Sequence, residues 1–142
     1  MKKSKILKVE LEYNYIFKIK DSDNGYIFNL RDITGSDLEF YERFFDPQFQ
    51  DEPFTFENKM SCLQLISDIR LRNIPYKKIN KLFNIALEFI FCNYIDKYTW
   101  LKYCHAIQNG RIYTLELEKE PMIKFLSICQ IHSEYVSAIN SK

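Results

Sequence analysis

Glycine and proline are scarce in this chain of 142 residues, with three and four copies respectively. Three glycines leave little material for the glycine-rich loops that cradle phosphate groups. The four cysteines are widely spaced and form no Cys-x-x-Cys pair, which argues against a disulfide scaffold. We therefore expect free thiols in a reducing compartment, no metal site and no cofactor.

An excess of charge of one sign is also missing. The 20 basic and 19 acidic residues give a net charge of +1, so no global field attracts a phosphate backbone or an anionic bilayer. The longest apolar stretch, Leu82 to Ile95, is too short to span a membrane. Charged residues near the N-terminus exclude the apolar core of a secretory signal. We expect no membrane contact and a cytoplasmic location.

Cysteine and histidine occur close together in two places, at Cys104 and His105 and at Cys129 and His132. Successive residues of a helix point about 100° apart, so Cys104 and His105 do not form a thiol–imidazole nucleophile. His132 falls within the apolar arc of the last helix, where a core histidine with one hydrogen bond is expected. Together these four residues could supply ligands for zinc, but structural zinc sites usually bring paired ligands on tight turns. We therefore expect no zinc site. The sequence thus favours a protein that is not an enzyme.

The clearest positive pattern lies at the N-terminus. Apolar residues occupy every odd position from Leu7 to Ile19, which predicts a strand with one buried face. The alternation resumes from Tyr26 to Leu30, after an Asn-Gly pair that supplies the positive φ angles of a tight turn. The pattern predicts an N-terminal β-hairpin in which Leu11 and Tyr13 face helices, whereas Glu10 and Glu12 face water or a partner.

Alternation at residues 113–117 predicts a third strand, paired with the first. Capping residues and prolines predict four or five helices. They are Gly35–Phe45 after Thr34, one starting at Thr55 or Glu57, one opened by Pro75, Asp96–Gln108 as a separate helix or a continuation of the one before, and a last one opened by Pro121. The predicted fold is a single α+β domain over residues 1–142, with a small antiparallel sheet packed against the helices.

Aromatic residues are frequent, at 16% of the chain. Phe49, Phe54 and Phe56 lie in or beside a segment with two prolines, Asp46 to Phe56, which predicts a loop. Aromatic residues in loops often anchor interfaces, although these rings could also cap the sheet. The broad apolar face of the last helix is a second candidate surface, since either the domain or a partner has to bury it.

A basic edge lies at the start of the helix opened by Pro75, where Lys77, Lys78 and Lys81 occur close together. The break before Pro75 resembles a helix–turn–helix, and such a second helix can meet a phosphate backbone or a major groove. The alternative is that these lysines solvate the outer face of a core helix, which the balanced net charge favours.

The stretch from Leu30 to Leu38, Leu-Arg-Asp-Ile-Thr-Gly-Ser-Asp-Leu, follows the hairpin and precedes a helix. This order, over about residues 6 to 45, resembles the opening of small tail-assembly and baseplate-assembly chaperones of tailed phages. Isoleucine and lysine, with 18 and 15 copies, are favoured in the manner of an AT-rich genome. The resemblance implies a non-catalytic assembly factor or structural accessory protein that binds a protein partner or forms a homo-oligomer. The alternative is a nucleic-acid-associated accessory factor.

Overall fold

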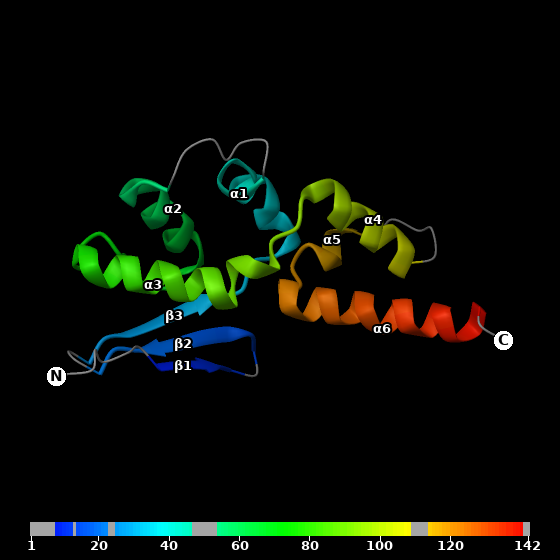
Figure 1. The fold of residues 1–142 in the computed structure, drawn as a ribbon, viewed down its shortest axis with the longest axis horizontal. Helices are drawn as coiled ribbons and strands as arrows, with labels where there is room; N and C mark the ends of the chain where they lie inside the picture. The colour runs from blue at the N-terminus through cyan, green and yellow to red at the C-terminus, as the bar shows by residue number, and fades with distance from the viewer. Residues whose placement is uncertain (1–7, 13, 23–24, 47–53, 109–113, 141–142) are drawn as a thin grey trace. The chain divides into compact units, whose positions relative to one another are not determined.

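The computed structural model describes residues 8–12, 14–22, 25–46, 54–108 and 114–140. The chain divides into two compact units, residues 1–32 with 52–92 and residues 33–51 with 93–142. The predicted α+β class is confirmed, because a three-stranded antiparallel sheet precedes and joins a set of helices (Figure 1). The prediction that the chain forms one domain stays a prediction.

The first unit contains the sheet, with strands β1 (Lys8–Leu11), β2 (Ile16–Lys20) and β3 (Ile27–Arg31) in the order β1-β2-β3. The predicted hairpin is therefore the β2–β3 pair, in which Phe17 lies opposite Leu30. Gly25 has the positive φ angle, 76°, that its turn requires.

The strand predicted from Leu7 to Ile19 is wrong as a single strand. A turn after β1 splits it: the Tyr15 N–H donates to the Glu12 carbonyl, and the Glu12 N–H donates to the Ile16 carbonyl. Tyr15 supplies the positive φ angle, 64°, that a glycine usually supplies in a hairpin of this length. Leu11 ends the edge strand and is 49% exposed, so the expectation that it faces helices is also wrong. Tyr13 lies outside the described residues.

Helices α2 (Phe56–Ile66) and α3 (Tyr76–Phe89) complete the first unit. Thr55 caps α2 as predicted, because its hydroxyl accepts the Asn58 N–H at 3.1 Å. Pro75 lies one position before α3, as its N-cap. The core joins one face of the sheet to both helices through Phe17, Ile19, Phe28, Leu30, Cys62, Leu63, Ile66, Ile79, Leu82, Phe83 and Ala86. A 3₁₀ turn, η3 (Phe91–Asn93), follows α3 and continues into the first residue of the second unit's 93–142 segment.

The second unit is helical in its described part. It contains a 3₁₀ turn, η1 (Gly35–Asp37), and helices α1 (Leu38–Phe45), α4 (Lys97–Ile107), α5 (Thr114–Leu117) and α6 (Met122–Asn140). The predicted helix Gly35–Phe45 is thus η1 continued by α1, with the Asp37 carboxylate accepting the Thr34 N–H at 2.9 Å. The core of this unit consists of Ile33, Leu38, Tyr41, Phe44, Trp100, Cys104, Met122 and Phe125.

The third strand predicted at residues 113–117 is wrong, because Thr114–Leu117 is a helical turn. Turn hydrogen bonds follow it, from the Lys119 N–H to the Glu116 carbonyl and from the Glu120 N–H to the Leu117 carbonyl. The predicted strand was expected to pair with the long first strand, whose second half is β2. In the structure, β1 occupies that edge of β2. The sheet has the predicted number of strands with a different member.

Candidate partner-binding surface on the last helix

Helix α6 is apolar around most of its circumference, and the described residues of the second unit cover one side of it. Its start is anchored: the Met122 N–H donates to the Ile33 carbonyl at 2.8 Å, and the Met122 and Phe125 side chains are buried. Of the 19 residues of the helix, only Lys124 and Glu134 carry full charges. A helix that is apolar all round is normally buried on all sides. The later turns of α6 are more exposed than this composition favours.

One apolar row lies on the solvent side of α6. We call Ile131, Tyr135 and Ile139 the outer stripe; they are 66%, 64% and 51% exposed. Residues four apart lie above one another on a helix, so these three side chains form a continuous ridge. Burying an exposed Ile side chain completely gains about 1.5–3 kcal/mol, and the described residues that surround the outer stripe leave much of that gain unrealised.

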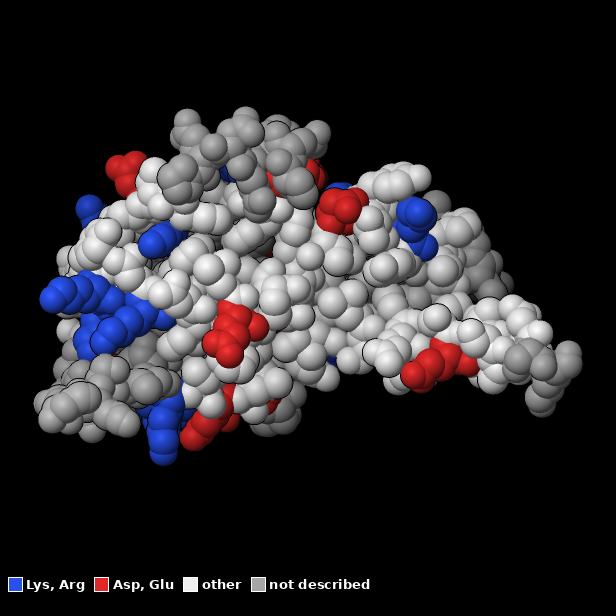
Figure 2. Space-filling view, in the orientation of Figure 1, with Lys and Arg blue, Asp and Glu red and all other residues white. Residues whose placement is uncertain are grey.

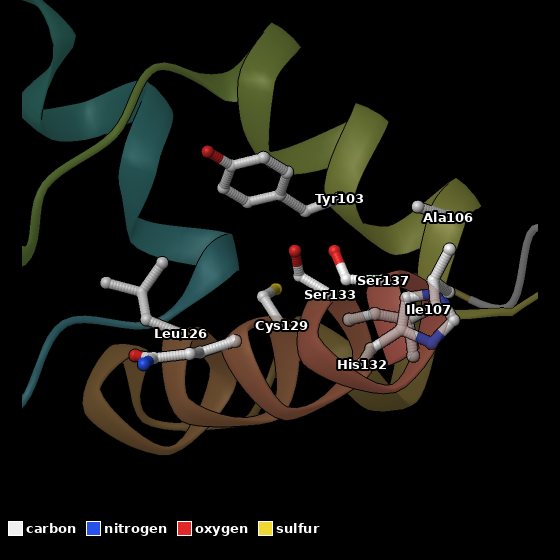
Figure 3. Close-up of a pocket in the computed structure, with 10 residues that line it drawn as sticks. Tyr103, Ala106, Ile107, Leu126, Cys129, His132, Ser133 and Ser137 are labelled. Carbon is white, nitrogen blue, oxygen red and sulfur yellow. The ribbon is translucent and has the colours of Figure 1, made fainter. Parts of the chain in front are cut away.

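The opposite side of α6 borders a groove. Helices α4 and α6 start in contact, with the Trp100 and Phe125 rings 5.7 Å apart. Toward their C-terminal ends the two helices border a groove of about 590 Å³. Figure 3 shows the side chains that line it. The groove is lined by Tyr103, Ala106, Ile107, Leu126, Cys129, Gln130, His132, Ser133, Val136 and Ser137.

Small side chains account for the groove. Cys129, Ser133 and Ser137 form a row along α6, and Ala106 contributes from α4. Close-packed interiors leave few voids larger than a water molecule, and small residues on both helices do not fill the space between them. We call this row of three the small-residue row. The groove is open to solvent and mostly apolar, with hydroxyl groups along it.

Two thiols lie at or near the groove, Cys129 in its lining and Cys104 on α4. Burial raises the pKa of the Cys129 thiol to about 11, and burial together with nearby Cys129 raises the pKa of Cys104 to about 11. Both thiols are protonated at neutral pH, whereas a nucleophilic cysteine needs a lowered pKa. No hydrogen bond reaches the His132 imidazole from any described residue, and His132 is half-buried at the groove. The expected core histidine with one hydrogen bond is therefore wrong.

Metal ligation finds no support in the described residues, which contain no group of three or more His, Cys, Asp or Glu side chains suited to hold an ion. In the same part of the chain, no helix is long and apolar enough to cross a membrane. His105 is exposed on α4, apart from the groove lining.

The predicted aromatic site is only partly described. Phe54 packs against the buried ring of Phe83, with centroids 5.1 Å apart, and Phe56 stacks on Tyr76 at 4.7 Å. Both rings are half-buried, so each already has a contact within the first unit. Phe49 lies outside the described residues. The role of these three residues in binding a partner stays a prediction.

The three lysines of the predicted basic edge separate by environment. Lys77 and Lys81 are exposed on α3, and Figure 2 shows basic side chains gathered near the N-terminal end of this helix. Lys78 instead pairs with the carboxylate of Asp21 at 2.5 Å, and the Asp21 side chain is fully buried. Lys78 thus neutralises a buried charge, which sequence reasoning did not detect.

Comparisons with known proteins found no matching family model, curated protein or solved structure.

Proposed function

We propose that this protein is a non-catalytic protein–protein interaction subunit whose contact surface is helix α6. The observation that carries the proposal is the exposure of the outer stripe, Ile131, Tyr135 and Ile139, on a helix with two charged residues in 19. Aromatic and aliphatic anchors of this kind dominate binding energy at interfaces. The partner that fits is a protein presenting an apolar helix face, since a ridge of residues four apart packs into the grooves of a second helix.

Within this proposal the protein is an assembly factor or structural accessory protein of a phage or a similar AT-rich genetic system, located in the host cytoplasm or the virion. Its residue usage, rich in isoleucine and lysine and poor in alanine, and the resemblance of residues 6–45 to phage assembly chaperones support this more specific description. The protonated thiols beside the groove support a role without catalysis.

A matched pair of tyrosines tests the proposal. Tyr135→Glu places a charge in the outer stripe, and Tyr98→Glu places the same charge on α4, where Tyr98 is 71% exposed. Affinity capture from native host cells, followed by mass spectrometry, compares both variants with the wild type. Specific partners should be lost with Tyr135→Glu and retained with Tyr98→Glu. Retention of all partners by Tyr135→Glu, with unchanged circular dichroism, would contradict the proposal.

The second candidate function is nucleic-acid binding through α3, favoured by the exposure of Lys77 and Lys81. Phosphate-driven binding falls steeply with salt, roughly in proportion to the number of phosphates neutralised. A salt titration with single- and double-stranded probes therefore separates the two functions. Salt-sensitive binding that Lys77→Glu and Lys81→Glu abolish would favour the nucleic acid, and an absence of binding at low salt would exclude it.

A further inference from the structure

We propose that the first unit binds single-stranded nucleic acid at the start of α3, where the exposed Tyr76 ring stacks on one base and the lysines beside it contact phosphates. This inference rests on the second candidate function and specifies its ligand. It is independent of the surface on α6. The distribution of charge between the units and an aromatic stack at the start of α3 carry it.

The balanced net charge of the chain conceals a division between its two units. The first unit contains 13 basic and 9 acidic residues, a net charge of +4, whereas the second contains 7 basic and 10 acidic residues, a net charge of −3. Charges farther apart than about 8 Å are largely screened at physiological ionic strength. Contact with a phosphate backbone therefore depends on the charge of one surface and not on the total for the chain.

The positive charge of the first unit is concentrated around the start of α3. From Ile69 to Leu87 the chain contains five basic residues and no acidic one. Lys78 pairs with the buried Asp21 carboxylate. The remaining four are exposed and form no ion pair with any described residue; they are Arg70, Arg72, Lys77 and Lys81. Lys77 and Lys81 lie one turn apart, and thus on one face of α3, at the end of the helix where Figure 2 shows basic side chains gathered.

A pair of stacked aromatic rings lies at the same end of α3. The Tyr76 ring stacks on the Phe56 ring of α2, with centroids 4.7 Å apart and an angle of 24° between the planes. Phe56 is half-buried, whereas Tyr76 is 59% exposed. One face of the Tyr76 ring is thus supported by the first unit, and the rest of the side chain is open to solvent. Proteins that bind single strands use such rings as platforms on which bases stack.

Lysines from both helices border this ring. Lys77 follows Tyr76 directly, and Lys81 lies one turn further along α3. From α2, the Lys59 ammonium group donates to the Asn80 side chain at 3.0 Å, and Asn80 lies one turn after Tyr76 on the same row of the helix. A base stacked on Tyr76 therefore has positive charge close to its phosphates.

These features favour a single strand over a duplex and over an acidic peptide. Bases in a duplex are already stacked on their neighbours, and extruding one costs free energy, whereas the bases of a single strand are free to stack on the protein. An acidic peptide can pair with the lysines but leaves the Tyr76 ring without a planar partner. Stacking is tolerant of sequence, so we expect little preference among bases.

Fluorescence anisotropy with a labelled oligothymidine and a duplex of equal length, at several salt concentrations, tests the inference. The wild type should bind the single strand more tightly. Tyr76→Ser should weaken this binding about 5- to 150-fold without changing its salt dependence, and Tyr76→Trp, which keeps a ring, should retain it. Lys77→Gln combined with Lys81→Gln should reduce the slope of log affinity against log salt by about 1.4, since each phosphate contact contributes about 0.7. Tyr98→Ser and Lys102→Gln, at exposed positions of α4, should bind like the wild type.

Three results would overturn the inference: single-strand binding that Tyr76→Ser leaves unchanged in a folded protein, a preference for the duplex, or displacement of the single strand by polyglutamate at equal charge concentration. If the lysine changes weaken binding and Tyr76→Ser does not, the second candidate function stands and the single-strand assignment fails. If neither probe binds at low salt, both fail.

Discussion

Replacing Lys78 by methionine should destabilise the first unit strongly, because the Lys78 ammonium group pairs with the buried carboxylate of Asp21. The Asp21 side chain is 0% exposed, that of Lys78 is 15% exposed, and the ion pair is 2.5 Å long. Methionine retains the apolar stem and removes the ammonium group. Removing one partner of a buried ion pair typically costs about 3–5 kcal/mol.

Lys77→Met provides the control, because Lys77 is exposed one residue earlier on the same helix. A surface substitution of this kind changes stability by about 0.5 kcal/mol or less. Urea unfolding followed by far-ultraviolet circular dichroism should lower the midpoint by about 2 M for Lys78→Met, given a slope of about 1–3 kcal/mol per molar urea. Adding Asp21→Asn should recover much of the loss. Equal urea midpoints for the two lysine variants would refute this reasoning. Lys78 would then behave as an exposed lysine of the predicted basic edge.

Two further predictions concern the second unit. A Cβ atom on Gly35 would overlap Cζ2 of the buried Trp100 indole. Gly35→Ala should therefore lower the free energy of unfolding by about 1–3 kcal/mol and shift the fluorescence emission of this single tryptophan. Gly25→Ala is the control, because a Cβ atom there meets open space, and it should leave the emission unchanged. Asp96 caps α4 by accepting the Thr99 N–H, and this bond lowers its pKa; Asp96→Ala should therefore cost about 1 kcal/mol at pH 7, with the difference from the wild type disappearing as the pH falls below about 4. Thr55→Ala, which removes a hydroxyl cap from α2, should cost a similar amount that does not vary with pH. A pH-independent cost for Asp96→Ala, or unchanged emission in Gly35→Ala, would contradict these assignments.

The helices could be predicted from sequence because their ends carry local chemical signals. Thr55 and Asp96 cap α2 and α4 with their own side chains, and Pro75 and Pro121 stand directly before α3 and α6. These signals depend on neighbours within a few residues, so tertiary packing does not override them.

The N-terminal strands show why periodicity alone was insufficient. Leu11 pairs with Phe17 across the β1–β2 turn, so odd-numbered residues pair with odd-numbered residues. The alternation therefore continues without a break through the turn, and one long strand gives the same pattern as two short ones. The residue with positive φ, Tyr15, is neither glycine nor asparagine, so its residue type did not indicate a turn.

The candidate site was predictable only in part. The apolar excess of α6 is visible in sequence and led to the expectation that the domain or a partner covers this helix. The groove was not predicted, because it depends on how α4 and α6 pack against each other in three dimensions. The row of Cys129, Ser133 and Ser137 was the available signal, but small residues at this spacing also occur in closely packed helices.

The central claim is that the exposed side of α6 binds protein, and site-specific photocrosslinking in native host cells tests it most directly. A benzophenone amino acid would replace Tyr135 in the outer stripe or, as the control, Tyr98 on α4. The account predicts a discrete covalent adduct to a protein from position 135 and no such adduct from position 98. A folded protein that gives no adduct from position 135, or the same adducts from both positions, would contradict the claim.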